Sequence, residues 1–73
     1  MKNVRIGIIG FGTMGRAHYQ YLSANEVSNA VVTAVFDVNE NVAKELAVNV
    51  RFFSNIDQFI DSHLFDAVLI ATP

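Results

Sequence analysis

The chain has 73 residues, of which 52% are hydrophobic, and a formal net charge of −2 at pH 7. A chain of this length buries only about 60% of its unfolded surface, so it forms one small domain at most. The slight acidity offers no attraction to nucleic acid or to an anionic membrane surface, and the absence of cysteine excludes disulfide and thiolate chemistry.

Targeting signals are also absent from the sequence. No apolar run approaches the ~20 residues that a membrane span needs. The N-terminus lacks the charged leader, apolar segment and cleavage site of a secretory signal. We therefore expect a cytoplasmic protein without a membrane or nucleic-acid partner.

The most informative stretch runs from residue 4 to residue 22. Residues 4–9 are rich in β-branched side chains, which predicts a buried strand. Gly10, Gly12 and Gly15 follow with the spacing G-x-G-x-x-G. The apolar period then becomes helical, and the expected core face of this helix consists of Met14, Ala17, His18, Tyr21 and Leu22. Strand, glycine turn and helix in this order predict a dinucleotide site, the alternative being a glycine-rich turn without a ligand.

Each glycine has an expected role in that site. Gly10 lets the chain turn sharply out of the strand, Gly12 leaves room for a pyrophosphate, and Gly15 lets the helix pack close to the strand. The amides around Thr13 and Met14 lack intrahelical partners and, with the positive end of the helix dipole, predict an anion site. The Thr13 hydroxyl can also cap the helix.

Two side chains beside the turn have two interpretations each. Phe11 covers the pyrophosphate, or it only packs at the turn. Arg16 reaches a phosphate, or it is simply solvated.

The second strand and helix follow after a polar loop. Residues 30–36 form a nearly continuous apolar run, which is typical of a strand covered on both faces. From Asn39 the helical period returns, and Glu40 precedes Lys44 by four residues, a favourable helix pair. The expected core face of this helix consists of Val42, Ala43, Leu46 and Ala47.

The remaining elements are shorter. Residues 50–53 predict a third strand, and Ser54 with Asp57 resembles a capping box. A third amphipathic helix follows, with Ile56, Phe59, Ile60 and Leu64 on its apolar face. Residues 66–71 predict a fourth strand.

Strands that alternate with helices imply βαβ units and a parallel sheet. We expect an α/β fold of the Rossmann type, with the spatial strand order 3-2-1-4 and a cofactor crevice at the carboxyl ends of the strands. A complete doubly wound sheet has two more strands. Residues 1–73 are therefore expected to be the N-terminal part of a dinucleotide-binding domain, at the front of a larger enzyme.

Two further positions lie at the carboxyl ends of predicted strands. Asp37 follows the second strand, where its carboxylate can accept hydrogen bonds from both hydroxyls of an adenosine ribose. It would repel the extra phosphate of NADP, so it favours NAD; the alternative is a turn residue that ends the strand. Thr72 and Pro73 follow the fourth strand, where they either touch the cofactor or form a plain proline turn.

These residues resemble the N-terminus of the Gfo/Idh/MocA family, which includes glucose-fructose oxidoreductase and inositol dehydrogenase. The similarity rests on three segments that together span nearly the whole chain, residues 10–18, 35–47 and 65–73. The glycine motif is common to many dehydrogenases. Its combination with His18 and with the terminal Asp-Ala-Val-Leu-Ile-Ala-Thr-Pro is more specific.

The resemblance implies an NAD(P)-dependent dehydrogenase of a sugar, a polyol or a related substrate. It also implies a separate substrate domain and, often, a homo-oligomer, and it supports cofactor roles for the three glycines, Asp37 and Thr72. In the family a Glu-Lys-Pro segment and a later Asp-x-x-x-His carry catalytic groups. Neither is present in these residues, so the sequence assigns no catalytic residue and no metal ligand.

Three other functions fit the same N-terminal pattern of strand, glycine turn and helix. One is a dehydrogenase of an amino-acid pathway, another is a non-catalytic NAD-sensing module, and the third is a methyltransferase that binds S-adenosylmethionine. The third glycine, on the helix, favours a pyrophosphate and argues against the methyltransferase.

Overall fold

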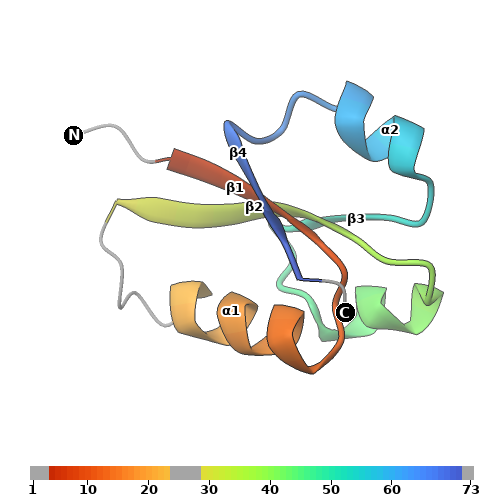
Figure 1. The fold of residues 1–73 in the computed structure, drawn as a ribbon, viewed down its shortest axis with the longest axis horizontal. Helices are drawn as coiled ribbons and strands as arrows, with labels where there is room; N and C mark the ends of the chain where they lie inside the picture. Colours follow the sequence, from red (N-terminus) through yellow and green to blue (C-terminus); the bar gives the residue numbers. More distant parts are fainter. Residues whose placement is uncertain (1–3, 24–28, 72–73) are drawn as a thin grey trace.

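A four-stranded parallel sheet forms the centre of the computed structural model, which describes residues 4–23 and 29–71. The strands are β1 (Val4–Ile9), β2 (Ala30–Phe36), β3 (Arg51–Phe53) and β4 (Ala67–Ile70), in the order β3-β2-β1-β4. Helix α1 (Thr13–Ser23) and a 3₁₀ helix, η1 (Glu40–Glu45), lie on one face of the sheet, and α2 (Ile56–Asp61) lies on the other (Figure 1). The predicted strand order 3-2-1-4 is confirmed.

Helix α1 turns a different side to the sheet from the one we predicted. The buried residues are Gly15 and Tyr19, whereas Met14 is 63% exposed and Tyr21 is 55% exposed. The predicted helical period is confirmed, but the inward face is offset by one residue: His18 and Leu22 of the predicted face are half-buried, whereas Ala17 is exposed. A Cβ on Gly15 would lie 2.0 Å from the carbonyl oxygen of Gly10, so Gly15 must face the turn, and the residues three, four and seven positions later follow it inward.

The opposite face of the sheet carries a cluster of phenylalanines around α2. The Phe59 side chain is fully buried and its ring stacks on Phe65 at a centroid distance of 4.6 Å. Phe53 and Phe36 contact the same ring at 5.9 and 6.1 Å. A Cβ on Gly7 would lie 2.8 Å from both Phe59 and Phe65, so the rings approach β1 only because that residue is glycine.

Strand β2 contains one residue more than β1 needs for regular pairing. Ile6 pairs with Val32 and Gly7 pairs with Ala34, so the intervening Thr33 is bulged out of the register. The Thr33 hydroxyl donates a hydrogen bond of 2.5 Å to the carbonyl of Leu64, in the loop before β4. Because of the bulge, Val32 and Val35 both belong to the core beneath α1.

The second predicted helix is the least accurate of the sequence predictions. Residues 40–45 form a 3₁₀ helix with one buried side chain, Val42; Ala43 and Ala47 are exposed, and Leu46 is extended and half-buried. One buried residue gives too little packing to stabilise a longer α-helix. Side chains three apart eclipse in a 3₁₀ helix, and among the described residues Glu40 and Lys44 form no ion pair.

The start of α2 also differs from the prediction by one residue. The N-cap is Asn55, whose side-chain oxygen accepts a hydrogen bond of 3.0 Å from the Gln58 amide, and not Ser54. Of the expected apolar face, Phe59 is buried, while Ile56 and Ile60 are 37% and 56% exposed. The third and fourth strands lie where they were expected, each slightly shorter than the predicted range.

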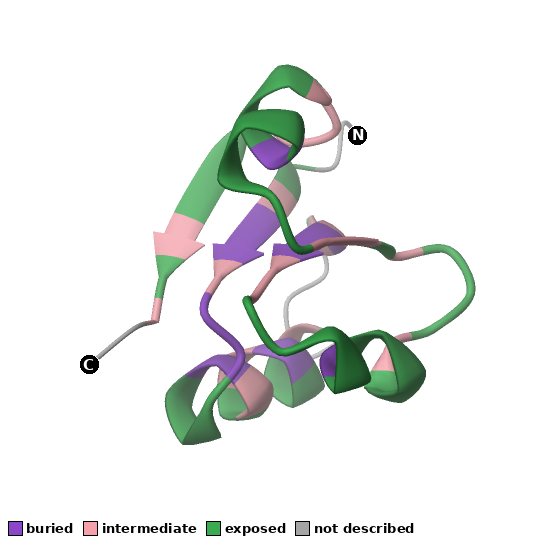
Figure 2. Ribbon diagram, turned by 90° about the vertical axis from the view of Figure 1, so that its right-hand side faces the viewer, coloured by how far each residue is buried: buried purple, intermediate pink, exposed green. Residues whose placement is uncertain are grey.

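Strand β4 is an edge of the described sheet and is poorly covered. Among the residues that the structure describes, it pairs only with β1. Figure 2 shows the strand mostly exposed beside the buried centre of the sheet, and Val68 and Ile70 are 43% and 71% exposed. An apolar edge with free backbone groups is a template for pairing with another strand.

We expect the isolated polypeptide 1–73 to self-associate through β4. The variant Ile70→Lys places a charge on that edge and should shift the polypeptide toward a monomer, because edge lysines oppose strand pairing. Val48→Lys adds the same charge at a fully exposed loop position and serves as the control. Analytical ultracentrifugation over a concentration series measures the effect; a wild-type polypeptide that stays monomeric throughout would contradict it.

Candidate dinucleotide site

The turn between β1 and α1 has the geometry that the glycine motif predicts. Gly10 has a φ of 93°, in the left-handed region that favours glycine. Its amide still donates to the carbonyl of Phe36 at 2.9 Å, so the ladder with β2 continues to the point where the chain turns. The oxygen of Gly10 then faces Gly15 at a distance that leaves no room for a side chain on the helix.

Gly12 differs from its two neighbours in the motif because nothing crowds it. A Cβ built there meets no atom within 4 Å and would point into open space. Its carbonyl accepts the first helical hydrogen bond, from the Arg16 amide at 2.9 Å, so Gly12 occupies the cap position that we had given to Thr13. The amides of Thr13 and Met14 precede that bond and have no acceptor one turn earlier in the helix. An open, positively polarised helix start is suited to a phosphate.

Asp37 lies directly against this turn although it is distant in sequence. One carboxylate oxygen accepts a hydrogen bond of 2.6 Å from the Phe11 amide, and the other accepts one of 2.8 Å from the Asn39 amide. The residue is half-buried at the end of β2, and its own amide donates to Phe53 on β3. A carboxylate has about four lone-pair sites, so each oxygen keeps capacity for one more donor, such as a ribose hydroxyl.

The ring of Phe11 packs inward rather than over the turn. It is 2% exposed, its centroid lies 5.5 Å from that of Tyr19, and the Arg16 guanidinium lies 5.1 Å from the ring centre. Of the two interpretations of Phe11, the structure supports packing for the side chain and leaves only the backbone facing the site.

Tyr19 was not singled out by the sequence, and its role depends on a contact that no local pattern reveals. The ring is buried beneath the sheet, and the hydroxyl accepts a hydrogen bond of 2.9 Å from the amide of Ala47, just beyond η1. Helix α1 thereby holds the segment that follows Asp37. The helical spacing from Gly15 to Tyr19 is the one signal that could have identified it.

Arg16 is neither simply solvated nor free. Its guanidinium donates two hydrogen bonds, of 2.6 and 2.7 Å, to the two carboxylate oxygens of Glu45 at the end of η1. The hydrogen bond to Glu45 raises the pKa of Arg16, and the charges of Glu45 and Asp37 act in the same direction. The same bond lowers the pKa of Glu45.

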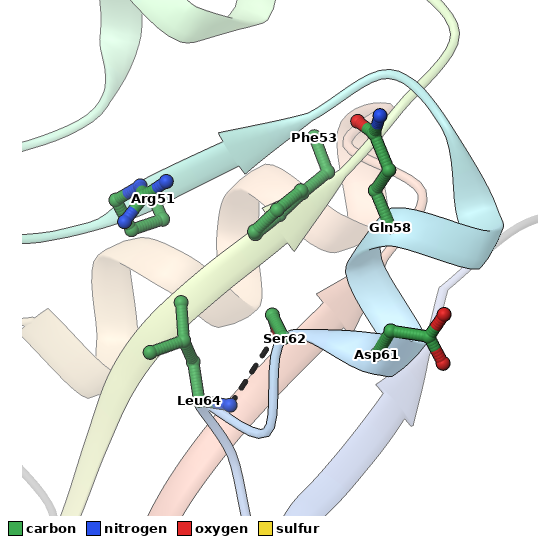
Figure 3. Close-up of a pocket in the computed structure, with 6 residues that line it drawn as sticks. All are labelled: Arg51, Phe53, Gln58, Asp61, Ser62 and Leu64. Carbon is green, nitrogen blue, oxygen red and sulfur yellow. Dashed lines mark hydrogen bonds between the residues drawn. The ribbon is translucent and has the colours of Figure 1, made fainter.

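Thr72 and Pro73 fall outside the described residues, whereas Ala71 donates its amide to Ile9 and lies beside Gly15. A pocket of 370 Å³ lies between β3 and α2, on the sheet face opposite α1, and contains none of the predicted site residues (Figure 3). It is lined by Arg51, Phe53, Gln58, Asp61, Ser62 and Leu64.

Within the described ranges no cluster of side chains could hold a metal ion, and no helix is long and apolar enough to cross a membrane.

The ion pair between Arg16 and Glu45 predicts a pH-dependent stability. Because the pKa of Glu45 is lowered in the folded chain, the pair stabilises the fold above the carboxyl's unfolded pKa of about 4.3 and loses that effect as the pH falls through the lower folded value. The Tm of wild type should therefore exceed that of Glu45→Gln near neutral pH, and the gap should narrow below about pH 4.3. Thermal denaturation of both proteins, with Glu40→Gln as a control on the same helix, measures this; a gap that does not change with pH would refute it.

The chain is similar in sequence to known enzymes. A 37% identical relative over 73 residues is an inositol 2-dehydrogenase/D-chiro-inositol 3-dehydrogenase of Shouchella clausii, of which the match covers 94% of this chain and 21% of the relative. A 2,7-anhydro-N-acetylneuraminate hydratase of Escherichia coli is 33% identical, with 96% of this chain and 18% of that protein covered.

Solved structures give the same result. A scyllo-inositol dehydrogenase from Lactobacillus casei, crystallised with NAD(H) and scyllo-inositol, superposes with a TM-score of 0.81 at 28% identity and covers 99% of this chain and 22% of that one. The chain therefore spans about a fifth of the length of the proteins it matches. The Gfo/Idh/MocA family model, described as an oxidoreductase family with an NAD-binding Rossmann fold, matches residues 4–73. The chain belongs to this family.

Proposed function

We propose that residues 1–73 are the N-terminal part of the dinucleotide-binding domain of a longer, NAD-dependent oxidoreductase. The observation that carries the proposal is the position of Asp37, whose carboxylate lies on the glycine turn and retains hydrogen-bonding capacity. A ribose held by that carboxylate would place its pyrophosphate toward the open side of Gly12 and the free amides of α1. The phosphates, the helix start and the acidic residue then form one binding surface.

The proposed reaction is hydride transfer between the nicotinamide and a sugar, a polyol or a related alcohol. Names of relatives support this substrate class, since the Shouchella clausii and Lactobacillus casei proteins are inositol dehydrogenases. Hydride chemistry is supplied by the nicotinamide, whereas this chain binds and orients its adenosine and pyrophosphate half. The substrate domain and the catalytic groups belong to other parts of the intact protein, which we propose to be a cytoplasmic homo-oligomer.

Each predicted cofactor residue has a definite proposed role. Gly10 and Gly15 shape the turn, while Gly12 leaves space for the pyrophosphate. Backbone amides at Phe11, Thr13 and Met14 line the same turn; that of Phe11 is already bonded to Asp37 and therefore orients the carboxylate instead of binding phosphate. Contacts from Thr72 and Pro73 to the cofactor remain part of the proposal on the basis of their place after β4.

A non-catalytic NAD-sensing module and an amino-acid-pathway dehydrogenase would use the same surface to bind the adenosine and pyrophosphate half of NAD. A turnover assay of the intact protein separates them: reduction of NAD with inositols or sugars as substrates supports the proposal, binding without turnover of any alcohol supports the sensor, and turnover of amino acids alone supports the second enzyme class. In the sequence of the intact protein, a Glu-Lys-Pro segment would favour the dehydrogenase.

Asp37→Ser should reduce the preference of the intact protein for NAD over NADP by about 1–3 kcal/mol, because a charge-assisted bond to the ribose and a repulsion of the extra phosphate are both lost. Calorimetric titration of both dinucleotides into wild type and variant measures the change. The matched control is Asp57→Ser, which removes the same charge from an exposed position on α2. Unchanged selectivity in Asp37→Ser would remove Asp37 from the ribose site.

Substitution of Gly12 should affect NAD binding, whereas substitution of Gly15 should affect the stability of the domain. Gly12→Val should fold normally and lose NAD binding, because its side chain extends into the open space where the pyrophosphate would lie. Gly15→Ala should destabilise the domain by at least about 1–3 kcal/mol, since its Cβ meets backbone that cannot move aside cheaply. Circular dichroism and NAD titration distinguish the two; a folded Gly12→Val protein with wild-type affinity would refute the close-approach argument.

A further inference from the structure

Arg16, beside the glycine turn, is held by Glu45, a residue that belongs neither to the glycine motif nor to the end of β2 where Asp37 lies. Arg16, one residue after Gly15, makes a bidentate ion pair with Glu45 at the surface, where the two side chains are 38% and 42% exposed. The planar guanidinium presents donors that match a carboxylate or a phosphate equally well. Glu45 therefore occupies the Nε–Nη2 edge of the guanidinium, two of its five N–H donors, and fixes the direction in which the others point.

The position of Arg16 relative to Asp37 makes this arrangement relevant to the cofactor. The guanidinium lies over the Phe11 ring at 5.1 Å, and the Phe11 amide is bonded to the Asp37 carboxylate. Asp37 contributes to raising the pKa of Arg16, which means that the two charges interact. A phosphate attached to a ribose at Asp37 would therefore come within reach of the same guanidinium.

We propose that Glu45 is a specificity-determining residue, which holds Arg16 and so prevents it from binding the ribose phosphate of NADP. The inference rests on the proposed function and extends it, since Asp37 alone is not the whole source of selectivity. Asp37, Arg16 and Glu45 together carry a net charge of −1, which repels a further phosphate on the ribose. Without the Glu45 charge the same group is neutral overall and its cation is free, as in sites where an arginine accommodates that phosphate.

A purely structural role for the ion pair is less consistent with the contacts around it. Segment 40–47 is already fixed to the rest of the fold by Val42, which is 3% exposed in the core, and by the hydrogen bond from the Ala47 amide to Tyr19. An ion pair of this exposure adds a small increment to stability, at most about 1 kcal/mol, which is less than the buried contacts supply. The pair is thus not needed to hold η1, and its clearest consequence is the direction in which Arg16 points.

The test compares NAD and NADP binding by the intact protein and three variants. We expect Glu45→Gln to bind NADP about tenfold more tightly than wild type, on the scale of a new bond to a charged group, with NAD affinity changed less than about twofold. The double variant Arg16→Gln/Glu45→Gln should lose this gain, because the gain requires the released guanidinium. Glu40→Gln removes one charge from the same helix, at an exposed position without an ion pair among the described residues, and should leave the NADP affinity unchanged.

Each outcome of this experiment has a distinct meaning. An unchanged NAD-to-NADP ratio in Glu45→Gln, an equal weakening of both cofactors, an equal gain in Glu40→Gln, or a gain that persists in the double variant would each overturn the role of Glu45 while the proposed function stands. A wild-type protein that binds neither dinucleotide would overturn the proposed function, and the role of Glu45 with it.

Discussion

The close approach of Gly15 to the backbone of Gly10 is the constraint on which the rest of this structure depends. A Cβ at that point would be 2.0 Å from a carbonyl oxygen, so the helix can reach the turn with only one residue type. That contact sets the rotation of α1, which places Tyr19 in the core. The Tyr19 hydroxyl in turn fixes the chain after η1. The absence of a side chain at Gly15 thus determines how α1 contacts the segment after η1, which is distant from it in sequence.

Asp37 links the sheet to this turn through the protein's own hydrogen bonds. Its carboxylate holds the Phe11 amide and its own following turn, so both the acidic group and the glycine loop are already fixed in relation to each other. A site organised in this way loses little conformational freedom when a ligand binds, which improves affinity without adding contacts. The same residue therefore serves the architecture of the turn and the proposed recognition of the ribose.

The sequence was most informative where a pattern is local and least informative where a contact is distant. Strand positions and their order followed from apolar runs and from the handedness of crossovers, and the glycine spacing located the turn. The prediction of an α-helix at residues 40–45 was wrong, because a helical period does not distinguish a short 3₁₀ helix from an α-helix when only Val42 is buried. The Arg16–Glu45 pair joins residues 29 apart and has no sequence signature. Asp37 was located by its distance from Gly15, but its bond to Phe11 was not predictable.

The bulge at Thr33 has a consequence for the face of the sheet on which Asp37 emerges. Side chains alternate between the faces of a strand, so one residue more or less reverses every position beyond it. Val32 and Val35 both face α1 because Thr33 is extra; Phe36 then faces Phe59, and Asp37 returns to the side of the glycine turn. If Val32 stayed in place and Thr33 took a regular place in the strand instead of bulging, the carboxylate would emerge among the phenylalanines. The bulge at Thr33 therefore sets the side of the sheet on which Asp37, four residues later, emerges. It determines whether the Asp37 carboxylate and the glycine turn can contact the same ligand.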